Sequence, residues 1–291
     1  MSCDASVVVT SEPDKVEGDR VAARAIGRLH ELEQRWSRFL PSSEISELNT
    51  SAGTLRQVSE PTFRLVEALV QAWHATDGAF DPTLLGTLVH LGYGASRDRA
   101  DRTTSLAPGT GVRGRPDEIV TRSSDRVVML PPGTTLDPGG LGKGLAADLI
   151  VDEILAAGAT GALVEVGGDL RAEGTPPAGA AWPISIDGTG EVVEITHGAV
   201  ATSTSRIRTW TTDGEHRHHL VDPSTLRSAG TDVESCTVIA GTAAWAEAFT
   251  KVAFSRGATD AITVCRRRGL AAAITTSAGV VATPGWEAFR R

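Results

Sequence analysis

Hydrophobic residues recur along the chain with two periods, every three or four positions in some segments and every second position in others. The first period is typical of helices that bury one face, and the second is typical of strands. Residues 20–39 follow the helical period up to Pro41, which predicts an amphipathic helix. Residues 42–49 follow neither period, and we expect a loop there. A second helix is predicted over residues 59–78, where Ser and Pro mark its start and Asp-Gly its end.

The rest of the chain mixes further helices and strands. Short apolar and β-branched runs predict strands at residues 6–10, 127–130, 162–166 and 233–239. Further helices are predicted at residues 143–157, 242–256 and 260–267, with hairpin turns at residues 213–214 and 277–279. Because no regular βα repeat is present, we expect an α+β fold with a mixed, largely antiparallel sheet flanked by helices.

Length and organisation bound the number of domains. The chain has 291 residues, enough for a substantial core, and shows neither an internal repeat nor a linker. Residues 95–121 are rich in Arg, Asp, Gly and Pro without a period, and we interpret them as a long loop. We therefore expect residues 1–291 to form a single domain, built as one unit or as two intimate subdomains.

Charge and composition exclude several classes of function. The 28 Lys and Arg residues against 36 Asp and Glu give a net charge of −8, which argues against a nucleic-acid partner. No apolar segment is long enough for a membrane span. The three cysteines, without a CxxC spacing, indicate neither a disulfide framework nor a zinc site. As written, the chain is expected to be cytoplasmic, with a removed export signal left open.

The strongest local signal is a glycine-rich turn that leads into the helix predicted from residue 143. Residues 137–144 read DPGGLGKG, and Lys143 lies among the glycines. Glycines let the backbone approach a ligand closely, and a helix N-terminus favours phosphate oxygens. The alternative is a turn whose glycines serve packing only. A Walker A loop is excluded because Asp137 and Gly144 stand where Gly and Ser or Thr are required. A dinucleotide fingerprint starting at Gly142 matches only weakly, because no strand runs directly into it.

Two further groups of polar residues are candidates for chemistry. Histidine is suited to proton transfer near neutral pH, and His219 is followed three residues later by Asp222 and then proline. His216 and His218 would share one face of a strand and are equally well explained as exposed hairpin residues. Glu247 and Lys251 lie one helical turn apart, a spacing that usually indicates a solvated ion pair.

Taken together and in order, seven segments resemble the flavin transferase family usually called ApbE. They are SEISELN at 43–49, GAFDPT at 78–83, DPGGLGKGLAAD at 137–148, GGD at 167–169, ATS at 201–203, HLVDPST at 219–225 and TAAWAEAFTK at 242–251. Each motif alone is modest, but the resemblance runs from about residue 35 to residue 279, nearly the whole chain.

The resemblance implies a flavin-binding fold and a reaction with FAD as donor. In the family reaction a Thr or Ser hydroxyl of an acceptor protein attacks the FMN-side phosphorus, and AMP leaves. The resemblance makes His219 the general base, with Asp222 beside it as a second catalytic residue. It also implies a set of residues that bind FAD: Asn49, Phe80, Asp81, Asp137, Gly139, Gly140, Lys143, Gly168, Asp169, Thr202 and Ser203.

The chain departs from the family at the metal site. The resemblance places the metal ligands at the backbone of Gly142 and at two side chains four residues apart, an Asp and a Thr in the family, where this chain has Glu247 and Lys251. A protonated lysine cannot bind a metal, so magnesium is left open and Lys251 is a candidate for supplying the charge itself. Leu226 also replaces the glycine that usually ends the histidine motif. Two alternatives remain, an FAD pyrophosphatase and a non-catalytic flavin-binding protein.

Overall fold

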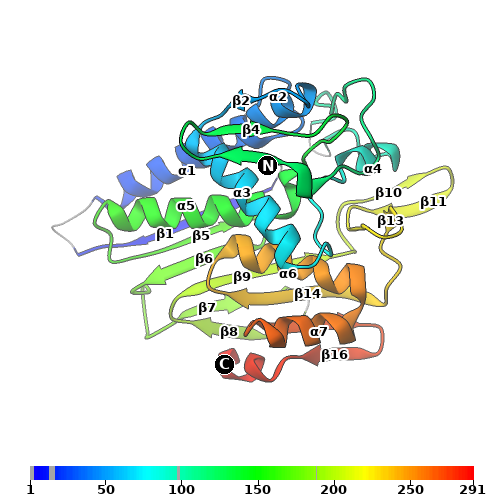
Figure 1. The fold of residues 1–291 in the computed structure, drawn as a ribbon. Helices are drawn as coiled ribbons and strands as arrows, with labels where there is room; N and C mark the ends of the chain where they lie inside the picture. The colour runs from blue at the N-terminus through cyan, green and yellow to red at the C-terminus, as the bar shows by residue number, and fades with distance from the viewer. Residues whose placement is uncertain (1–2, 13–16, 97–98, 188) are drawn as a thin grey trace. The chain divides into compact units, whose positions relative to one another are not determined.

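The structure is a computed structural model that describes residues 3–12, 17–96, 99–187 and 189–291 (Figure 1). It divides into two compact units, each made from separate stretches of chain. Unit 1 contains residues 32–142 and 205–231, and unit 2 contains residues 3–31, 143–204 and 232–291. Among the described residues, no helix combines the length and the apolar character that crossing a membrane requires.

Unit 2 is built on a seven-stranded sheet in which all neighbouring strands run antiparallel. In spatial order the strands are β1 (Ala5–Thr10), β5 (Gly161–Val166), β6 (Asp169–Gly174), β9 (Gly198–Thr204), β14 (Val233–Ala240), β15 (Ala271–Thr276) and β16 (Gly279–Ala282). Alternate residues along the central strands point to opposite faces, and both faces are covered, so these strands are buried on both sides.

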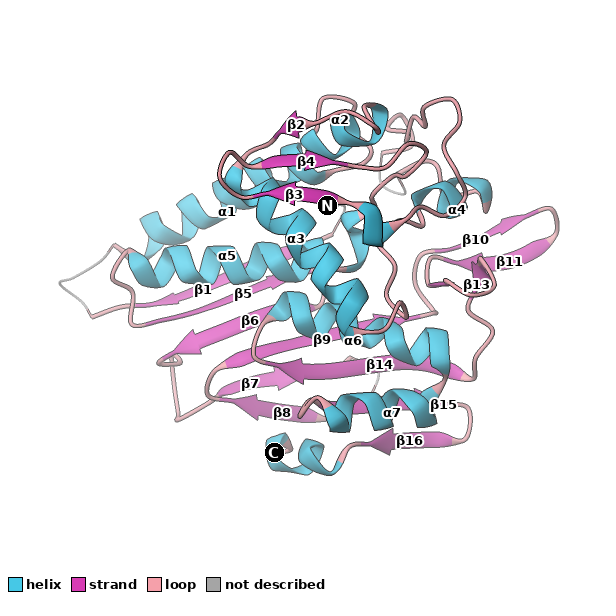
Figure 2. Ribbon diagram, viewed as in Figure 1, coloured by secondary structure: helices cyan, strands magenta, loops and turns pink. Residues whose placement is uncertain are grey.

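Helices cover one face of this sheet (Figure 2). They are α5 (Gly142–Ala156), α6 (Ala243–Arg256) and α7 (Ala258–Arg267). Helix α6 packs on the central strands β9 and β14, while α7 packs on β15. Ten of the fourteen residues of α6 are buried, and the helix lacks the polar stripe of a surface helix.

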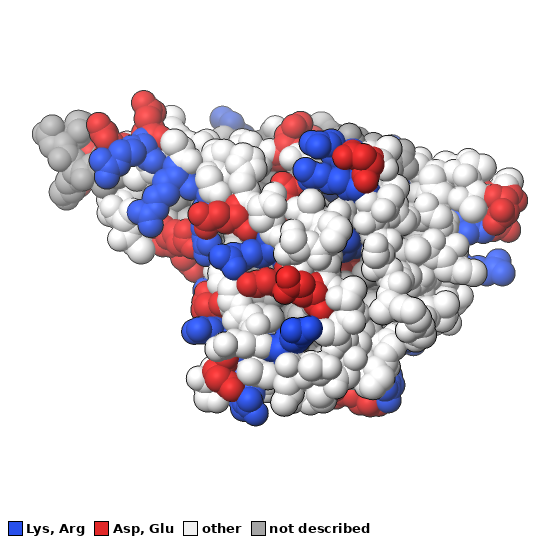
Figure 3. Space-filling model, turned by 90° about the horizontal axis from the view of Figure 1, so that it is seen from above, with Lys and Arg blue, Asp and Glu red and all other residues white. Residues whose placement is uncertain are grey.

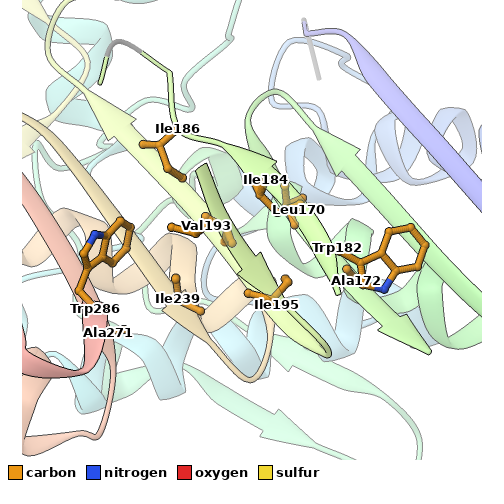
Figure 4. Close-up of a cluster of buried hydrophobic side chains, with 11 residues drawn as sticks. Leu170, Ala172, Trp182, Ile184, Ile186, Val193, Ile195, Ile239, Ala271 and Trp286 are labelled. Atoms are coloured by element: carbon orange, nitrogen blue, oxygen red, sulfur yellow. The ribbon is translucent and has the colours of Figure 1, made fainter. Parts of the chain in front are cut away.

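The opposite face of the sheet is closed by a hairpin and the C-terminal turn. Strands β7 (Trp182–Ser185) and β8 (Val192–Ile195) pair with each other, and η3 (Pro284–Phe289) follows the last strand. Their apolar side chains form a core against the sheet (Figure 4). The core contains Leu170, Ala172, Trp182, Ile184, Ile186, Val193, Ile195, Val200, Ile239, Ala271 and Trp286. Unit 2 is therefore a three-layer structure of helices, sheet and hairpin.

Unit 1 is smaller and combines short helices, a three-stranded sheet and two hairpins with much irregular chain. Helix α1 (Gly18–Trp36) carries the chain into it, and α2 (Glu44–Thr50), α3 (Glu60–Ala75) and α4 (Leu85–His90) follow. A three-stranded sheet has the order β2 (Arg56–Gln57), β4 (Val127–Met129), β3 (Val120–Arg122), and two short 3₁₀ helices are η1 (Pro116–Glu118) and η2 (Pro138–Gly140). Two hairpins complete the unit: β10 (Thr209–Thr212) with β11 (Glu215–His218), and β12 (Val221–Asp222) with β13 (Arg227–Ser228).

The expected α+β class with a largely antiparallel sheet agrees with this structure, but two local predictions are wrong. Residues 42–49 are not a loop: Ser43 accepts a hydrogen bond from the Ser46 N–H and caps α2, whose Ile45 and Leu48 are buried. The first helix stops at Trp36, three residues before its predicted end. The segment interpreted as a long loop is largely irregular, apart from η1 and the start of β3, with residues 97–98 outside the described part.

Charged side chains of both signs are intermingled on the face shown in Figure 3. Charged side chains of the described residues often form local pairs; Arg28, for example, lies 2.9 Å from Glu31 and 3.0 Å from Glu153. Surface pairs of this kind contribute little to stability. Another group of charged side chains is buried in unit 2.

Candidate functional site

A buried cluster of two lysines and two carboxylates lies in unit 2. The Lys143 ammonium, in the first turn of α5, donates to Asp169 Oδ2 at 2.5 Å and to Glu247 Oε1. Lys251 Nζ lies 3.7 Å from the same Glu247 oxygen and donates to the Glu247 carbonyl at 2.9 Å. The Glu247 side chain is completely buried and that of Asp169 is 2% exposed. The cluster therefore joins α5, the start of β6 and α6 through charge-assisted hydrogen bonds.

The close approach of α5 to α6 holds Glu247 in place. The Gly144 N–H donates to Glu247 Oε2 at 2.8 Å. A Cβ at position 144 would lie only 2.4 Å from the carbonyl carbon and oxygen of Ala243, so this approach requires glycine. One turn further along α5, the Asp148 carboxylate accepts from the N–H groups of Ala243 and Ala244 at 2.8 and 2.9 Å. Asp148 thereby satisfies the first turn of α6, where backbone donors have no helical partner.

Burial and charge set the protonation of these carboxyls. Burial alone would raise the pKa of Glu247, but the ammoniums of Lys143 and Lys251 and the Gly144 N–H hold it below its usual range. Burial raises the pKa of Asp169 to about 6, against the opposing effect of Lys143, and the neighbouring Glu247 adds to the rise. Burial also raises the pKa of Asp148 to about 6. Near neutral pH the cluster therefore holds ionised carboxylates beside ammonium groups.

Residues of the sheet that were predicted to bind FAD are linked to this cluster by hydrogen bonds. Asp169 begins β6 directly after the turn that contains Gly168, and its other carboxylate oxygen accepts from the Thr202 N–H at 3.2 Å. The Ser203 hydroxyl lies 2.6 Å from that of Thr250, which bonds the Glu247 carbonyl at 2.7 Å. The structure thus brings together Lys143, Asp169, Thr202, Ser203, Glu247 and Lys251 in one unit.

The glycine-rich turn in unit 1 is held by two side chains. Asp137 caps η2 by accepting from the Gly139 N–H at 2.9 Å. The buried Asn49 amide donates to the Leu136 carbonyl at 2.9 Å and accepts from the Leu136 N–H at 2.7 Å, as a neighbouring strand would. Gly139 is exposed and Gly140 partly exposed at this turn. Asn49 therefore fixes the backbone immediately before the turn.

The segment around Asp81 lies against the same turn. The Asp137 N–H donates to the Pro82 carbonyl at 2.8 Å. The Asp81 carboxylate accepts from the backbone and hydroxyl of Thr83 at 2.8 and 2.6 Å and from Arg113 at 2.8 Å, and Phe80 is buried next to it. Asn49, Phe80, Asp81 and the Asp137 turn are therefore neighbours within unit 1.

Sequence reasoning missed Arg38, which is 6% exposed and lies beside this turn. Its Nε is 3.4 Å from Asp137 Oδ2, and its other nitrogens donate to Thr104 and to the Tyr93 carbonyl. The guanidinium also lies 4.2 Å from the Phe39 ring centroid and 4.7 Å from that of Tyr93. The available signal was an arginine next to the apolar residues Trp36, Phe39 and Leu40, because such a charge is buried only when it is paired.

The histidine segment forms a hairpin edge and the turn after it. His216 is exposed on β11, whereas His218 Nε2 lies 3.1 Å from the Ala229 carbonyl. Burial lowers the pKa of His218, so it is neutral near pH 7. His219 follows the strand and is partly buried. The Asp222 carboxylate accepts from the Ser224 N–H and hydroxyl at 2.9 and 2.8 Å and from Thr225 at 3.2 Å, so it organises the turn that follows.

Leu226 ends this turn with a φ of 56°, in the left-handed region. Here the resemblance expects glycine, which adopts this conformation without strain. Leu226 is therefore held in a conformation that costs a leucine more than a glycine.

Comparison with known proteins identifies relatives along most of the chain. The sequence model of the ApbE family matches residues 1–274. A protein of Escherichia coli K12 named FAD:protein FMN transferase is 29% identical over 236 residues, which cover 76% of this chain and 66% of that protein. One of the same name from Chlamydia trachomatis is 26% identical over 251 residues, 83% of this chain and 78% of its own. The chain thus spans just under two thirds of the first of these relatives.

Solved structures show the same fold. The ApbE protein of Thermotoga maritima superimposes with a TM-score of 0.84 at 25% identity, covering 99% of this chain and 96% of that one. The flavin transferase ApbE of Vibrio cholerae gives a TM-score of 0.81 at 22% identity, with the same coverage. These similarities confirm the predicted α+β fold.

Proposed function

Because the chain belongs to the ApbE family, we propose that it transfers the FMN part of FAD to a Thr or Ser hydroxyl of an acceptor protein and releases AMP. The observation that carries this proposal is the family match over residues 1–274, together with relatives that are named FAD:protein FMN transferase. The retained histidine and glycine segments support it, since transfer of a phosphate-linked group to a hydroxyl needs a general base and hydrogen-bond donors for the phosphate oxygens.

In the proposed reaction the acceptor hydroxyl oxygen forms a bond to the FMN-side phosphorus of FAD. The bond from that phosphorus to the bridging oxygen breaks, and AMP leaves with this oxygen. His219 takes the hydroxyl proton as general base, and Asp222 holds the turn that follows His219. Developing negative charge on the phosphoryl oxygens requires donors or cations.

The residues proposed to bind FAD are those that the resemblance implies. The unit 1 set is Asn49, Phe80, Asp81, Asp137, Gly139 and Gly140, and the unit 2 set is Lys143, Gly168, Asp169, Thr202 and Ser203. Within unit 1, Asn49 would act through the backbone of Leu136, since its amide is engaged there. Arg38 joins this set as a positioning residue for Asp137.

Release of AMP from FAD tests the proposal. The purified chain is incubated with FAD, with and without a protein extract of the source organism, and covalently bound flavin is detected by fluorescence after denaturing electrophoresis. Transfer predicts AMP release that depends on the extract and a fluorescent acceptor band. Release without acceptor would indicate a pyrophosphatase instead, and no release would indicate a flavin-binding protein.

Two histidine variants sharpen the test. His219→Ala should slow AMP release by about a hundredfold or more, the usual contribution of a general base. The exposed His216 is the matched control, and His216→Ala should leave the rate unchanged. Equal rates in both variants would contradict the role of His219. A cytoplasmic location stays a prediction that cell fractionation can test.

A further inference from the structure

We propose that the Lys143 ammonium is the resident cation of the buried cluster and that this chain takes no divalent metal ion there. What this inference means for catalysis rests on the proposed function. The arrangement of charges stands independently of it. The inference concerns Lys143, Asp169, Glu247 and Lys251, all of which belong to unit 2.

The Lys143 ammonium occupies the position that a bridging cation would take between the two carboxylates. It donates to Asp169 Oδ2 at 2.5 Å and to Glu247 Oε1 at the same time. The second oxygen of Glu247 accepts from the Gly144 N–H, and the second oxygen of Asp169 accepts from the Thr202 N–H. Each carboxylate oxygen of the pair therefore already faces a donor, and a metal ion would have to displace one.

Lys251 adds a second positive charge to the same group. Its ammonium lies 3.7 Å from Glu247 Oε1 and is held by the Glu247 carbonyl, one turn back along α6. Two ionised carboxylates thus face two ammoniums, so the four side chains carry no net charge. A divalent ion would raise this to a net charge of +2 in a buried place, where like charges repel most strongly.

The ligand chemistry points the same way. Magnesium prefers several oxygen ligands at short distance in near-ideal geometry. The position where the family provides a threonine hydroxyl here carries Lys251, which has no lone pair to offer while protonated. Among the described residues, no group of three or more His, Cys, Asp or Glu side chains is placed to hold a metal ion. The residues of this cluster therefore do not fit the magnesium that the family implies.

Metal binding by the full chain without FAD tests the inference independently of any reaction. Manganese(II) serves as the probe, because its paramagnetic signal falls when it binds. We expect no binding to the wild-type chain at millimolar manganese. Lys143→Met removes the bridging ammonium and leaves the charges of both carboxylates uncompensated by it. Because the charge of the oxygen ligands sets the affinity of such sites, we expect the affinity for manganese to rise by about a hundredfold. Glu247→Gln in the Lys143→Met background should abolish this gain.

Every outcome of this experiment bears on the inference. Stoichiometric manganese on the wild-type chain, lost in Glu247→Gln, would overturn it. So would a folded Lys143→Met variant that gains no affinity. If Lys143→Met fails to fold, the wild-type titration still decides. Failure of FAD turnover would overturn the proposed reaction and leave these binding results standing.

Discussion

Replacing Gly144 with alanine should destabilise the chain strongly, because this position sets the distance between α5 and α6. A Cβ there would lie 2.4 Å from the carbonyl carbon and oxygen of Ala243 and 2.6 Å from the Ala244 nitrogen. These atoms belong to backbone in the first turn of α6, which cannot move aside as the end of a flexible side chain can. The two helices would have to separate, and the Gly144 N–H would lose the Glu247 carboxylate.

The magnitude follows from these two effects. Overpacking a well-packed interior costs about 1–3 kcal/mol. Loss of a hydrogen bond to a buried charge costs about 1.5–3 kcal/mol. The effects share one movement, so we expect the free energy of unfolding to fall by roughly 3–5 kcal/mol. The variant should also release the constraint that orients Glu247 toward Lys143.

Gly27→Ala is a matched control, because it makes the same Gly-to-Ala change as Gly144→Ala and gives a variant of the same amino-acid composition. Gly27 is exposed in α1, in unit 2, and a Cβ there meets no atom within 4 Å. This change should stabilise the chain by about 1 kcal/mol through helix propensity. Urea denaturation followed by circular dichroism measures both variants. Should Gly144→Ala unfold at the same urea concentration as Gly27→Ala, the close approach of the helices would be refuted.

Two further changes test single features of the fold. Because burial raises the pKa of Asp148 from 3.8 to about 6, the native chain keeps a proton that the unfolded chain releases over this window. The stability of the wild type relative to Asp148→Asn should therefore fall as pH rises from about 4 to 7, by up to about 3 kcal/mol, and a difference independent of pH in urea titrations would contradict this. Leu226→Gly should stabilise the chain by about 0.5–1 kcal/mol. It relieves the strain of a left-handed backbone at a φ of 56°, and the larger backbone entropy that glycine loses on folding offsets part of this gain. Leu226→Ala keeps the strain, so an equal rise in melting temperature in both variants would show that the conformation is not the cause.

Elements with a local signal could be predicted from the sequence. Ser59 and the following proline mark the start of α3, and Thr242 caps α6 as its position before an alanine-rich run suggests. Asp213-Gly214 turns the β10–β11 hairpin with both residues at positive φ. In each case the cause is confined to a few neighbouring residues. The seven-residue helix α2 was not predicted, because it is too short to show a clear hydrophobic period.

The buried cluster could be predicted only in part. Lys143, Glu247 and Lys251 were singled out from the sequence itself, and Asp169 through the resemblance. However, Lys143 lies 26 residues from Asp169 and 104 from Glu247, and no local pattern predicts that these side chains meet. The spacing of Glu247 and Lys251 is the same for a solvated pair and a buried one. The solvated interpretation is wrong, because Glu247 is completely buried. The apolar neighbours of Glu247 on α6, which leave no polar stripe, were the signal that favoured burial.

The neutral balance of the buried cluster limits how this sequence can change over generations. Loss of Lys143 or Lys251 alone leaves an uncompensated carboxylate in the interior, and loss of Glu247 or Asp169 alone leaves an excess ammonium. Breaking one partner of a buried pair typically costs about 3–5 kcal/mol, a large part of the stability of an ordinary domain. When Lys251 is replaced by threonine in evolution, a bound metal ion or a second substitution must therefore compensate the buried negative charge that remains. Positions 143, 169, 247 and 251 should accordingly vary together among related sequences rather than one at a time.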